Sequence, residues 1–226
     1  MPKSFILNYV EDKMVRGVGQ KTPGPVVTIA REYGCPGMHI AQQVAAGLSQ
    51  KGPDWKMVDR EVIEQAANEL GVSIDEADRI SRSGPPGFFQ NLISGFAQQQ
   101  NPGDAAVKRR IAQVIRAVAL AGNVVILGRG GVVITRDVKH SLHVKLYAPL
   151  TYRTERVRKM DQLGSDREAH EKMAAVDRER IYLRDYFAGE VASPDIFDIQ
   201  FNCARLSEAE IVGAIVAIAL DKFRNI

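Results

Sequence analysis

The residues best suited to bind or transfer an anion lie in short turns that follow apolar runs. The first turn is REYGCPGMH, residues 31–39, which follows the apolar run VVTIA and precedes residues with helical spacing. Backbone N–H groups at the start of a helix bind phosphate, and glycines such as Gly34 and Gly37 let a phosphate approach the backbone closely. The segment lacks the lysine and the serine or threonine of a complete phosphate-binding loop, G-x-x-x-x-G-K-[ST]. It is therefore either an incomplete phosphate-binding loop or an ordinary turn between a strand and a helix.

A second turn places an arginine among glycines at the end of another apolar run. Arg129 lies within LGRGG, residues 127–131. Its guanidinium can hold a phosphate through two donors in a fixed geometry, which a lysine cannot do. The neighbouring glycines suggest that another group approaches the backbone closely. An arginine that pairs with a nearby acid would also explain the residue, so both interpretations stay open.

Residues 151–185 hold nine basic and eight acidic side chains in a stretch of helical character. Most charge runs of this kind are solvated helices with many ion pairs. Asp177, Arg180 and Arg184 are three and four residues apart, however, so they share one face of a helix. That face could close over a substrate as a lid, deliver arginines to its phosphates and exclude water.

Three other residues have a plain structural explanation beside a functional one. Asp59 follows the apolar stretch WKMV and precedes a helical pattern, so it could contact a ligand or could only cap the helix. Cys35 and His39 could act as a nucleophile and its base. No residue pattern supplies the third member or the oxyanion site that such catalysis needs, so we expect no cysteine chemistry.

The elements that must position these residues alternate between strands and helices. The expected strands are 26–30, 55–59, 124–128, 143–148 and 196–202. This alternation predicts an α/β fold with a five-stranded parallel sheet between two helical layers. Ligands bind such sheets at the carboxyl ends of the strands. Residues 31–39, Asp59 and residues 128–131 should therefore meet at one edge of the sheet.

Composition limits the classes of protein to which the chain can belong. The 226 residues carry a net charge of +3 and are 45% hydrophobic, as expected for one ordinary globular domain. This charge is too small to favour a nucleic-acid partner. The two cysteines show no disulfide or metal pattern, and no apolar run is long enough to span a bilayer, so we expect a cytoplasmic protein without a membrane segment. The composition leaves the oligomeric state open.

Six strings in the same order resemble the cytidylate kinase-like family, a branch of the P-loop nucleoside monophosphate kinases, over roughly residues 26–220. They are REYGCPGMH, MVDREVI, ILGRGG, LYAPLTYRTERVRKM, the Asp-x-x-Arg segment from Asp177 to Arg180, and FDIQFNC. The resemblance implies a three-layer P-loop kinase fold with a helical lid. It also implies transfer of the γ-phosphoryl group of ATP to a nucleoside monophosphate such as CMP or dCMP, with Mg²⁺ as the metal.

The same resemblance implies an organisation of the chain. An N-terminal extension, residues 1–25, would precede a kinase-like domain, residues 26–226. Residues of about 60–110 would form the acceptor-binding region, with a breaker-rich insertion at 83–104. The lid would comprise residues of about 151–190.

Roles for individual residues also follow from the resemblance. The ATP phosphates would contact the first turn, through Arg31, Gly34, Cys35, Gly37, Met38 and His39. Asp59 and Arg129 would bind the acceptor. The groups that act on the transferred phosphoryl would be Arg129, Arg180 and Arg184. The lid would contribute Arg156, Asp177 and Arg180, and no side chain is expected to be a metal ligand.

The chain departs from the family's pattern where the chemistry takes place. Met38 stands at a position that is usually basic, His39 at one that usually carries a hydroxyl, and Pro36 removes a backbone donor. Gly130 stands where cytidylate kinases have an acid. Loss of charge stabilisation slows phosphoryl transfer by orders of magnitude. Two functions therefore stay open: a nucleotide kinase that uses arginines in place of the lysine, and a catalytically impaired nucleotide-binding or regulatory protein on the same fold.

Overall fold

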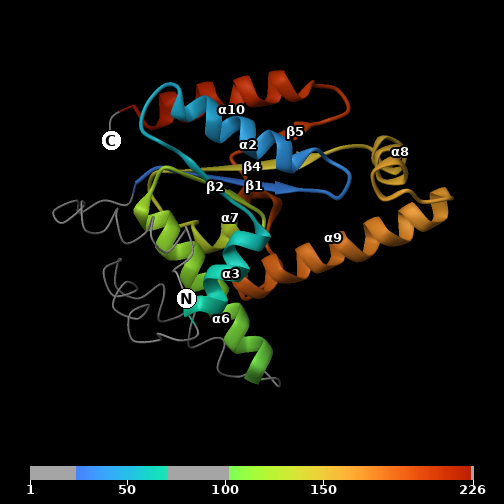
Figure 1. Ribbon diagram of the computed structural model, residues 1–226, viewed down its shortest axis with the longest axis horizontal. Helices are drawn as coiled ribbons and strands as arrows, with labels where there is room; N and C mark the ends of the chain where they lie inside the picture. Colours follow the sequence, from blue (N-terminus) through green and yellow to red (C-terminus); the bar gives the residue numbers. More distant parts are fainter. Residues whose placement is uncertain (1–23, 71–101, 225–226) are drawn as a thin grey trace.

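The computed structural model describes residues 24–70 and 102–224, and every structural statement below concerns this part of the chain. Five parallel strands form one sheet with helices on both faces (Figure 1), which confirms the predicted fold class. The strands are β1 (Val26–Arg31), β2 (Lys56–Val58), β3 (Val124–Leu127), β4 (Ser141–Tyr147) and β5 (Ile199–Asn202). The helices are α2 (Gly37–Ser49), α3 (Arg60–Leu70), α6 (Pro102–Ala121), α7 (Gly131–Ile134), α8 (Leu150–Asp161), α9 (Asp166–Ala188) and α10 (Glu208–Lys222), with a short 3-10 helix η2 (Pro194–Ile196).

The strand order is β2-β3-β1-β4-β5, so β1 lies at the centre of the sheet. In register, Ile29 of β1 lies opposite Leu127 of β3 and Val144 of β4. The carboxyl ends of β1 and β3 are therefore neighbours. Two connections consequently meet at one edge of the sheet: residues 32–36, called here the β1–α2 loop, and residues 128–130, called here the β3–α7 turn.

The central strands are apolar because both of their faces are covered. Helices α2 and α10 lie on one face of the sheet, and α3, α6 and α7 lie on the other (Figure 1). Along β1, Val27 and Ile29 pack into the core under α2 and α10, whereas Val26 packs into the core with α3 and α6. This alternation is the period of two that a strand imposes on its side chains.

Helices α8 and α9 project from the sheet beside the β1–α2 loop (Figure 1) and are called here the lid, the name given to this region in the sequence prediction. Ser165 caps α9 by accepting a hydrogen bond from the backbone N–H of Glu168 at 3.2 Å. Only a small apolar cluster lies where the two helices meet, with Val157, Ala169 and Met173 buried. Polar contacts with β1 and the β1–α2 loop add to this cluster, and the C-terminal part of α9 is anchored separately, because Leu183 and Phe187 are buried in the core with α7.

Most strand boundaries differ from the sequence expectation by one or two residues, and two differences are larger. The last strand begins at Ile199 rather than at residue 196, because the η2 turn, capped by Ser193, comes before it. The four-residue helix α7 was not expected, since its sequence reads as a continuation of the glycine-rich turn.

Two predicted segments lie almost entirely outside the described residues. They are the N-terminal extension, residues 1–25, and the insertion at 83–104. Within the described parts of the chain, no helix combines the length and the apolar character that crossing a bilayer requires.

Candidate functional site

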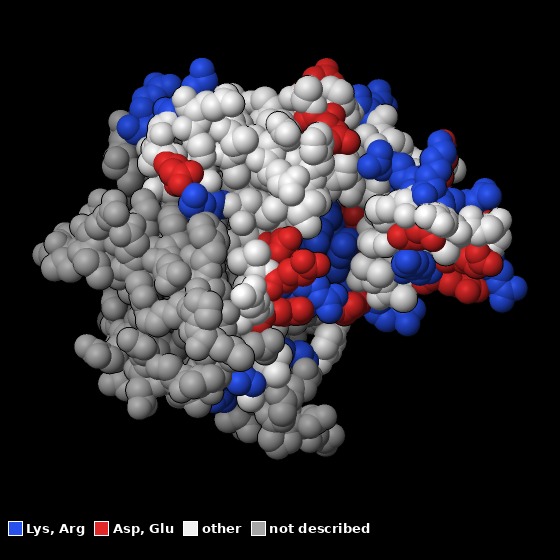
Figure 2. Space-filling model, viewed as in Figure 1, with Lys and Arg blue, Asp and Glu red and all other residues white. Residues whose placement is uncertain are grey.

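A cavity of about 470 Å³ opens at the carboxyl ends of β1 and β3, under helix α9. This volume lies within the usual range for small-molecule sites, about 300–1,000 Å³. Its charged lining is predominantly basic: Arg31, Arg60, Arg129, Lys145, Arg180 and Arg184, against Glu32, Asp177 and Glu179. Figure 2 shows basic side chains gathered where α3 faces α9, bordered by acidic ones. The cavity is therefore suited to an anionic ligand.

Arg31, the last residue of β1, lies between the start of α2 and the β3–α7 turn. Its aliphatic part packs against Gly37, where a Cβ would come within 2.9 Å of its Cγ. Its guanidinium occupies the space that a Cβ on Gly128 would need. Burial, followed by repulsion from Arg180 and Arg129, lowers the pKa of Arg31 from 12.5 to about 9. Three guanidinium groups from separate elements therefore converge near Arg31.

The β3–α7 turn is held in a left-handed conformation that non-glycine residues rarely adopt. Gly128, Arg129 and Gly130 have φ values of 76°, 53° and 70°. A Cβ at Gly130 would lie 2.6 Å from the Phe187 ring of α9, so the helix packs directly on the turn. Arg129 pays a conformational cost of about 1–3 kcal/mol in this turn. Such strain is characteristic of residues whose position is required for function.

Arg129 is directed into the protein and is only partly satisfied there. Its side chain is 11% exposed; it contacts Glu64 of α3 and lies 3.9 Å from Glu179 of α9. Its Nε is buried without a hydrogen-bond partner among the described residues. Burial, followed by repulsion from Arg60, lowers the pKa of Arg129. Arg129 thus pairs with an acid, as one sequence interpretation predicted, and also keeps a donor that nothing in the described structure satisfies. Its contact with a phosphate stays a prediction.

The lid binds the β1–α2 loop mainly through the loop's carbonyl groups. Arg180 donates to the carbonyl oxygen of Arg31 at 3.0 Å, and Arg156 donates to that of Gly34 at 3.0 Å. Asp177 accepts from the backbone N–H of Tyr33 at 2.7 Å and from Arg153 at 2.8 Å. The predicted lid residues Arg156, Asp177 and Arg180 therefore hold the lid to the loop in this structure.

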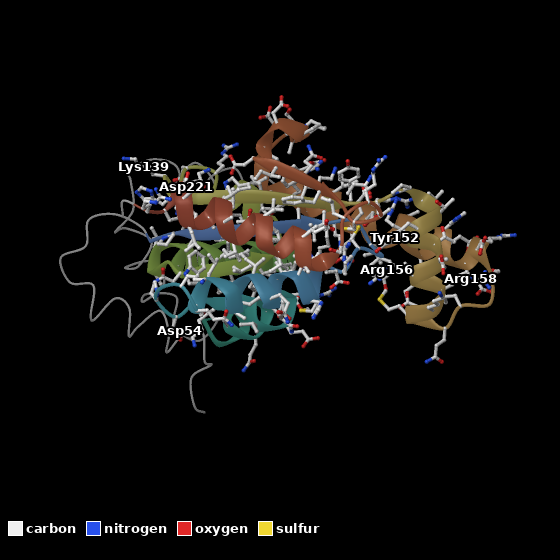
Figure 3. The ribbon with its side chains drawn as sticks, turned by 90° about the horizontal axis from the view of Figure 1, so that it is seen from above. Asp54, Lys139, Tyr152, Arg156, Arg158 and Asp221 are labelled. Atoms are coloured by element: carbon white, nitrogen blue, oxygen red, sulfur yellow. The ribbon has the colours of Figure 1, made fainter. Side chains whose placement is uncertain are left out.

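The arginines of the lid point in different directions and have different partners. Arg156 points toward the edge of the sheet, whereas Arg158 lies on the far side of α8 (Figure 3) and pairs with Asp166 at 2.8 Å. On α9, Arg184 lines the cavity and pairs with Asp185 at 2.8 Å. The shared helical face predicted for Asp177, Arg180 and Arg184 is the face that lines the cavity.

The loop residues that the sequence assigned to ATP phosphates do not all face the same space. A Cβ at Gly34, which has a φ of 93°, would come within 3.0 Å of Arg153, so α8 covers this glycine. The side chain of Met38 is 44% exposed, and His39 contacts Glu208 at the start of α10. The cavity lining includes neither residue. Their backbone N–H groups nevertheless have no partner within the described chain, which leaves two donors at the start of α2.

The two cysteines, far apart in sequence, are neighbours in the fold. Cys35 of the β1–α2 loop and Cys203, which follows β5, pack in the same apolar cluster. Contact with the Cys203 thiol, and then burial, raises the pKa of the Cys35 thiol. His39 contacts Glu208 instead, so it is not placed as a base for Cys35.

Asp59 caps helix α3, as the simpler sequence interpretation predicted. Its Oδ1 accepts a hydrogen bond from the backbone N–H of Val62 at 3.1 Å. Its charge acts on Arg31 and opposes the lowering of that residue's pKa. A capping role does not prevent the second carboxylate oxygen from reaching a ligand.

Sequence reasoning missed several of the charged groups at and beside this site, including Arg60 and Glu32 of the cavity lining. Glu64 and Glu179, the acids beside Arg129, lie on helices and carry no local signal. Lys145 lies within β4 and lines the cavity. A lysine inside an otherwise apolar strand is the one signal that could have found it.

Comparison with known proteins identifies the family and a structure with a similar fold. The cytidylate kinase-like family matches residues 26–205, whereas no curated protein matches the chain. A crystal structure of an uncharacterized protein from Eubacterium ventriosum ATCC 27560 is similar, with a TM-score of 0.68 at 16% identity, over 87% of this chain and 98% of that one. At such low identity the likeness shows the fold alone. The family match covers most of the chain and confirms the resemblance read from its motifs: the chain belongs to the cytidylate kinase-like family.

Proposed function

We propose that this chain is a phosphotransferase that moves the γ-phosphoryl group of ATP to a nucleoside monophosphate, with CMP and dCMP as the first candidates. Family membership supports a nucleotide kinase-like function in general. The observation that carries the proposal is the convergence of Arg31, Arg129 and Arg180 on one cavity.

Phosphoryl transfer requires little covalent chemistry from the protein. It requires two anions to be positioned together and the charge on the moving group to be neutralised. Three guanidinium groups at one cavity meet that requirement, since each offers a fixed set of donors to phosphate oxygens. The cost of burying them together, evident in the lowered pKa of Arg31, is offset when a phosphate binds.

The position of Arg31 suggests how the two substrates are arranged. Its side chain extends from Gly37 at the start of α2 to Gly128 in the β3–α7 turn. We assign the ATP phosphates to the α2 side, where the N–H groups of Met38 and His39 are available, together with residues 34–37. We assign the acceptor phosphate to the side of Arg129 and Asp59, with residues of about 60–110 as the acceptor region. Arg180 and Arg184 reach the cavity from the lid.

The residues present do not form a magnesium site of their own. No group of three or more His, Cys, Asp or Glu suitable for a metal occurs among the described residues. The three acids of the cavity are each engaged with arginines. Magnesium commonly binds through substrate phosphates with few protein ligands, so we assign the ion to the nucleotide and no step to the protein's carboxylates.

A second function is favoured by the state of the β1–α2 loop. The lid binds the N–H of Tyr33, two carbonyl groups of the loop and the carbonyl group of Arg31, and residues 36–39 contain no lysine or hydroxyl. These features would suit a nucleotide-binding or regulatory protein that binds phosphate without transferring it.

One experiment separates the two functions. ADP release is measured with ATP and magnesium in the presence of CMP, dCMP, UMP, AMP or no acceptor, and ATP binding is measured in parallel by calorimetry. Release that depends on one acceptor supports the kinase. Binding of ATP without release on any acceptor supports the regulatory alternative. Absence of both overturns both functions.

A further inference from the structure

Lys145 is a basic side chain of the cavity that comes from the sheet itself. It lies in β4, half-buried, and is aligned with Ala30 of β1, one residue before Arg31. Neighbouring strands are about 4.8 Å apart, so the backbones of Lys145 and Arg31 are close. Both residues line the same cavity, but their side chains leave the sheet on opposite faces, because Lys145 shares the face of its partner Ala30 and Arg31 shares the face of Ile29.

Lys145 and Arg31 differ from the other basic residues of the cavity in having no acidic partner. Among the described residues, neither forms an ion pair or a side-chain hydrogen bond. Each of the other four lies within 4 Å of a carboxylate: Arg60 and Arg129 at Glu64, Arg180 at Asp177, and Arg184 at Asp185. Within residues 24–70 and 102–224, neither Lys145 nor Arg31 therefore has a carboxylate at ion-pair distance, although Asp59 and Asp177 act on the charge of Arg31 from farther away.

The acids near Lys145 are already committed to other groups. Glu32 lies 3.3 Å from Arg153 and accepts the backbone N–H of Ala148. Asp198 accepts the backbone N–H of His143 at 2.7 Å and lies 3.4 Å from Lys222. A turn of either carboxylate toward Lys145 would break these contacts.

A half-buried ammonium without a counter-ion is costly, because it loses part of its hydration and gains little in return. The contact that the structure gives it is with the ring of Phe197, whose centroid is 5.9 Å from Nζ. An interaction of this kind is worth only about 0.5–1 kcal/mol when it is exposed. An anionic oxygen of a ligand would offset the cost more fully, since an ammonium offers three donors.

We propose that Lys145 supplies from β4 the ammonium group that the β1–α2 loop lacks, and that it holds a phosphoryl oxygen of the ligand beside Arg31. The proposal rests on the function proposed above, in which this cavity is the site of phosphoryl transfer. Met38 stands where a basic residue is usual, but its side chain is exposed and lies outside the cavity lining. Lys145 therefore takes over the charge from a different strand.

Lys145 and Arg31 approach one cavity from different strands and faces of the sheet, so a ligand with two linked phosphoryl groups can contact both more readily than one with a single group. We therefore expect the protein to bind pyrophosphate more tightly than orthophosphate. Lys145→Met removes the charge while keeping the unbranched chain, and Lys145→Arg keeps the charge. Lys139→Met is the matched control, because Lys139 is exposed and lies at the opposite end of the molecule from the lid (Figure 3).

Binding of pyrophosphate, orthophosphate and ATP is measured by calorimetry for the full chain and its three variants. Loss of one charge-assisted contact in Lys145→Met is expected to weaken pyrophosphate about tenfold or more, with a smaller effect on orthophosphate. Lys145→Arg is expected to restore most of the affinity, and Lys139→Met to leave it unchanged. If turnover is found, Lys145→Met raises the KM for the phosphate-bearing substrates.

The possible failures are distinguishable. Wild-type affinity for pyrophosphate in a folded Lys145→Met protein would overturn the role of Lys145 and leave the proposed function standing. An equal loss in Lys145→Met and Lys145→Arg, at unchanged thermal stability, would also overturn it, since charge would then not be what matters. If the wild-type protein binds neither pyrophosphate nor ATP, the proposed function fails and this inference fails with it.

Discussion

The β1–α2 loop and the β3–α7 turn lie at the same edge of the sheet, follow neighbouring strands and are both rich in glycine. They differ in where their polar groups find partners. In the β1–α2 loop, Arg153, Arg156 and Asp177 of the lid bind backbone groups directly. In the β3–α7 turn, Arg129 is held in a left-handed conformation with a buried donor that no described group satisfies.

This difference indicates which of the two connections is built for a ligand. Polar groups that the protein satisfies internally contribute to stability, whereas a buried donor left unsatisfied has a free-energy cost that only a ligand recovers. A complete phosphate-binding loop would make the first connection the centre of the site. In this chain the β3–α7 turn is the better candidate for contact with the ligand, and the β1–α2 loop positions Arg31 and the lid around it.

Replacement of Arg129 is the most direct test of whether the β3–α7 turn matters more for the ligand than the β1–α2 loop. Arg129→Ala should lower turnover, or anion affinity if no turnover is found, by about a hundredfold or more, as when one transition-state donor is removed elsewhere. Steady-state kinetics and calorimetry measure the effect. Arg224→Ala, which removes an exposed arginine paired with Asp221 on the far side of the fold, is the control. Wild-type turnover in the Arg129→Ala protein would contradict this prediction and would indicate that the β1–α2 loop makes the main contacts with the ligand.

His143 tests the other half of the comparison, that satisfied groups serve stability. Its Nδ1 lies 2.7 Å from Thr28 and its Nε2 lies 3.1 Å from Ser141. Burial lowers the pKa of His143 from 6.5 to about 4, against the opposing effect of Asp198 and with a further lowering by Lys222. Between these two pH values His143 is protonated in the unfolded chain but neutral in the native chain. The free energy of unfolding therefore falls as the pH falls.

The loss from pH 7 to pH 4 should be about 3 kcal/mol, at about 1.4 kcal/mol per unit of pKa. Urea unfolding at several pH values measures it. His143→Gln, which keeps hydrogen-bonding groups but cannot titrate, should show a flatter dependence on pH over the same range. Parallel curves for the two proteins would show that His143 is not the group responsible.

Two glycines separate the cost of a left-handed backbone from the cost of crowding at the β3–α7 turn. Gly130 has a φ of 70° and its Cβ would meet Phe187 at 2.6 Å, whereas Gly189 has a φ of 75° and open space around it. Gly189→Ala should cost about 1 kcal/mol of stability from conformation alone, and Gly130→Ala about 1–3 kcal/mol more. Thermal unfolding measures both. Equal losses would show that α9 does not press on the turn.

The sequence predicts the fold well because its signals are local and repeated. The apolar run of β1 and the stripe of Ile40, Val44 and Leu48 on α2 arise because almost all of these side chains are buried in the core. Arg129 was identified for the same reason, since three glycines beside an arginine are visible in the chain. The partners of Arg129 could not be predicted, because Glu64 and Glu179 reach it from helices whose packing no short segment encodes.

The assignment of the ATP phosphates to residues 34–39 remains a prediction, and the structure changes its details. A family motif identifies positions, but it does not say which way a side chain points once residues are replaced. Met38 and His39 occupy positions of the motif, yet their side chains lie outside the cavity lining. Lys145, which belongs to no motif, lies within it.

The smallest expected effect comes from restoring the residues that the β1–α2 loop lacks. Met38→Lys together with His39→Ser recreates the usual lysine and hydroxyl, but both positions are exposed at the start of α2 and outside the cavity lining. A new ammonium there would remain in solvent, where a charge contributes little, about 0–1 kcal/mol. We therefore expect turnover and ATP affinity within about fivefold of wild type, because a surface contact of that size changes an equilibrium only this far. A gain of a hundredfold in either quantity would show that an ammonium at residue 38 reaches the phosphates that the N–H groups at the start of α2 are proposed to hold, and that the missing lysine and hydroxyl, not the β3–α7 turn, limit this protein's activity.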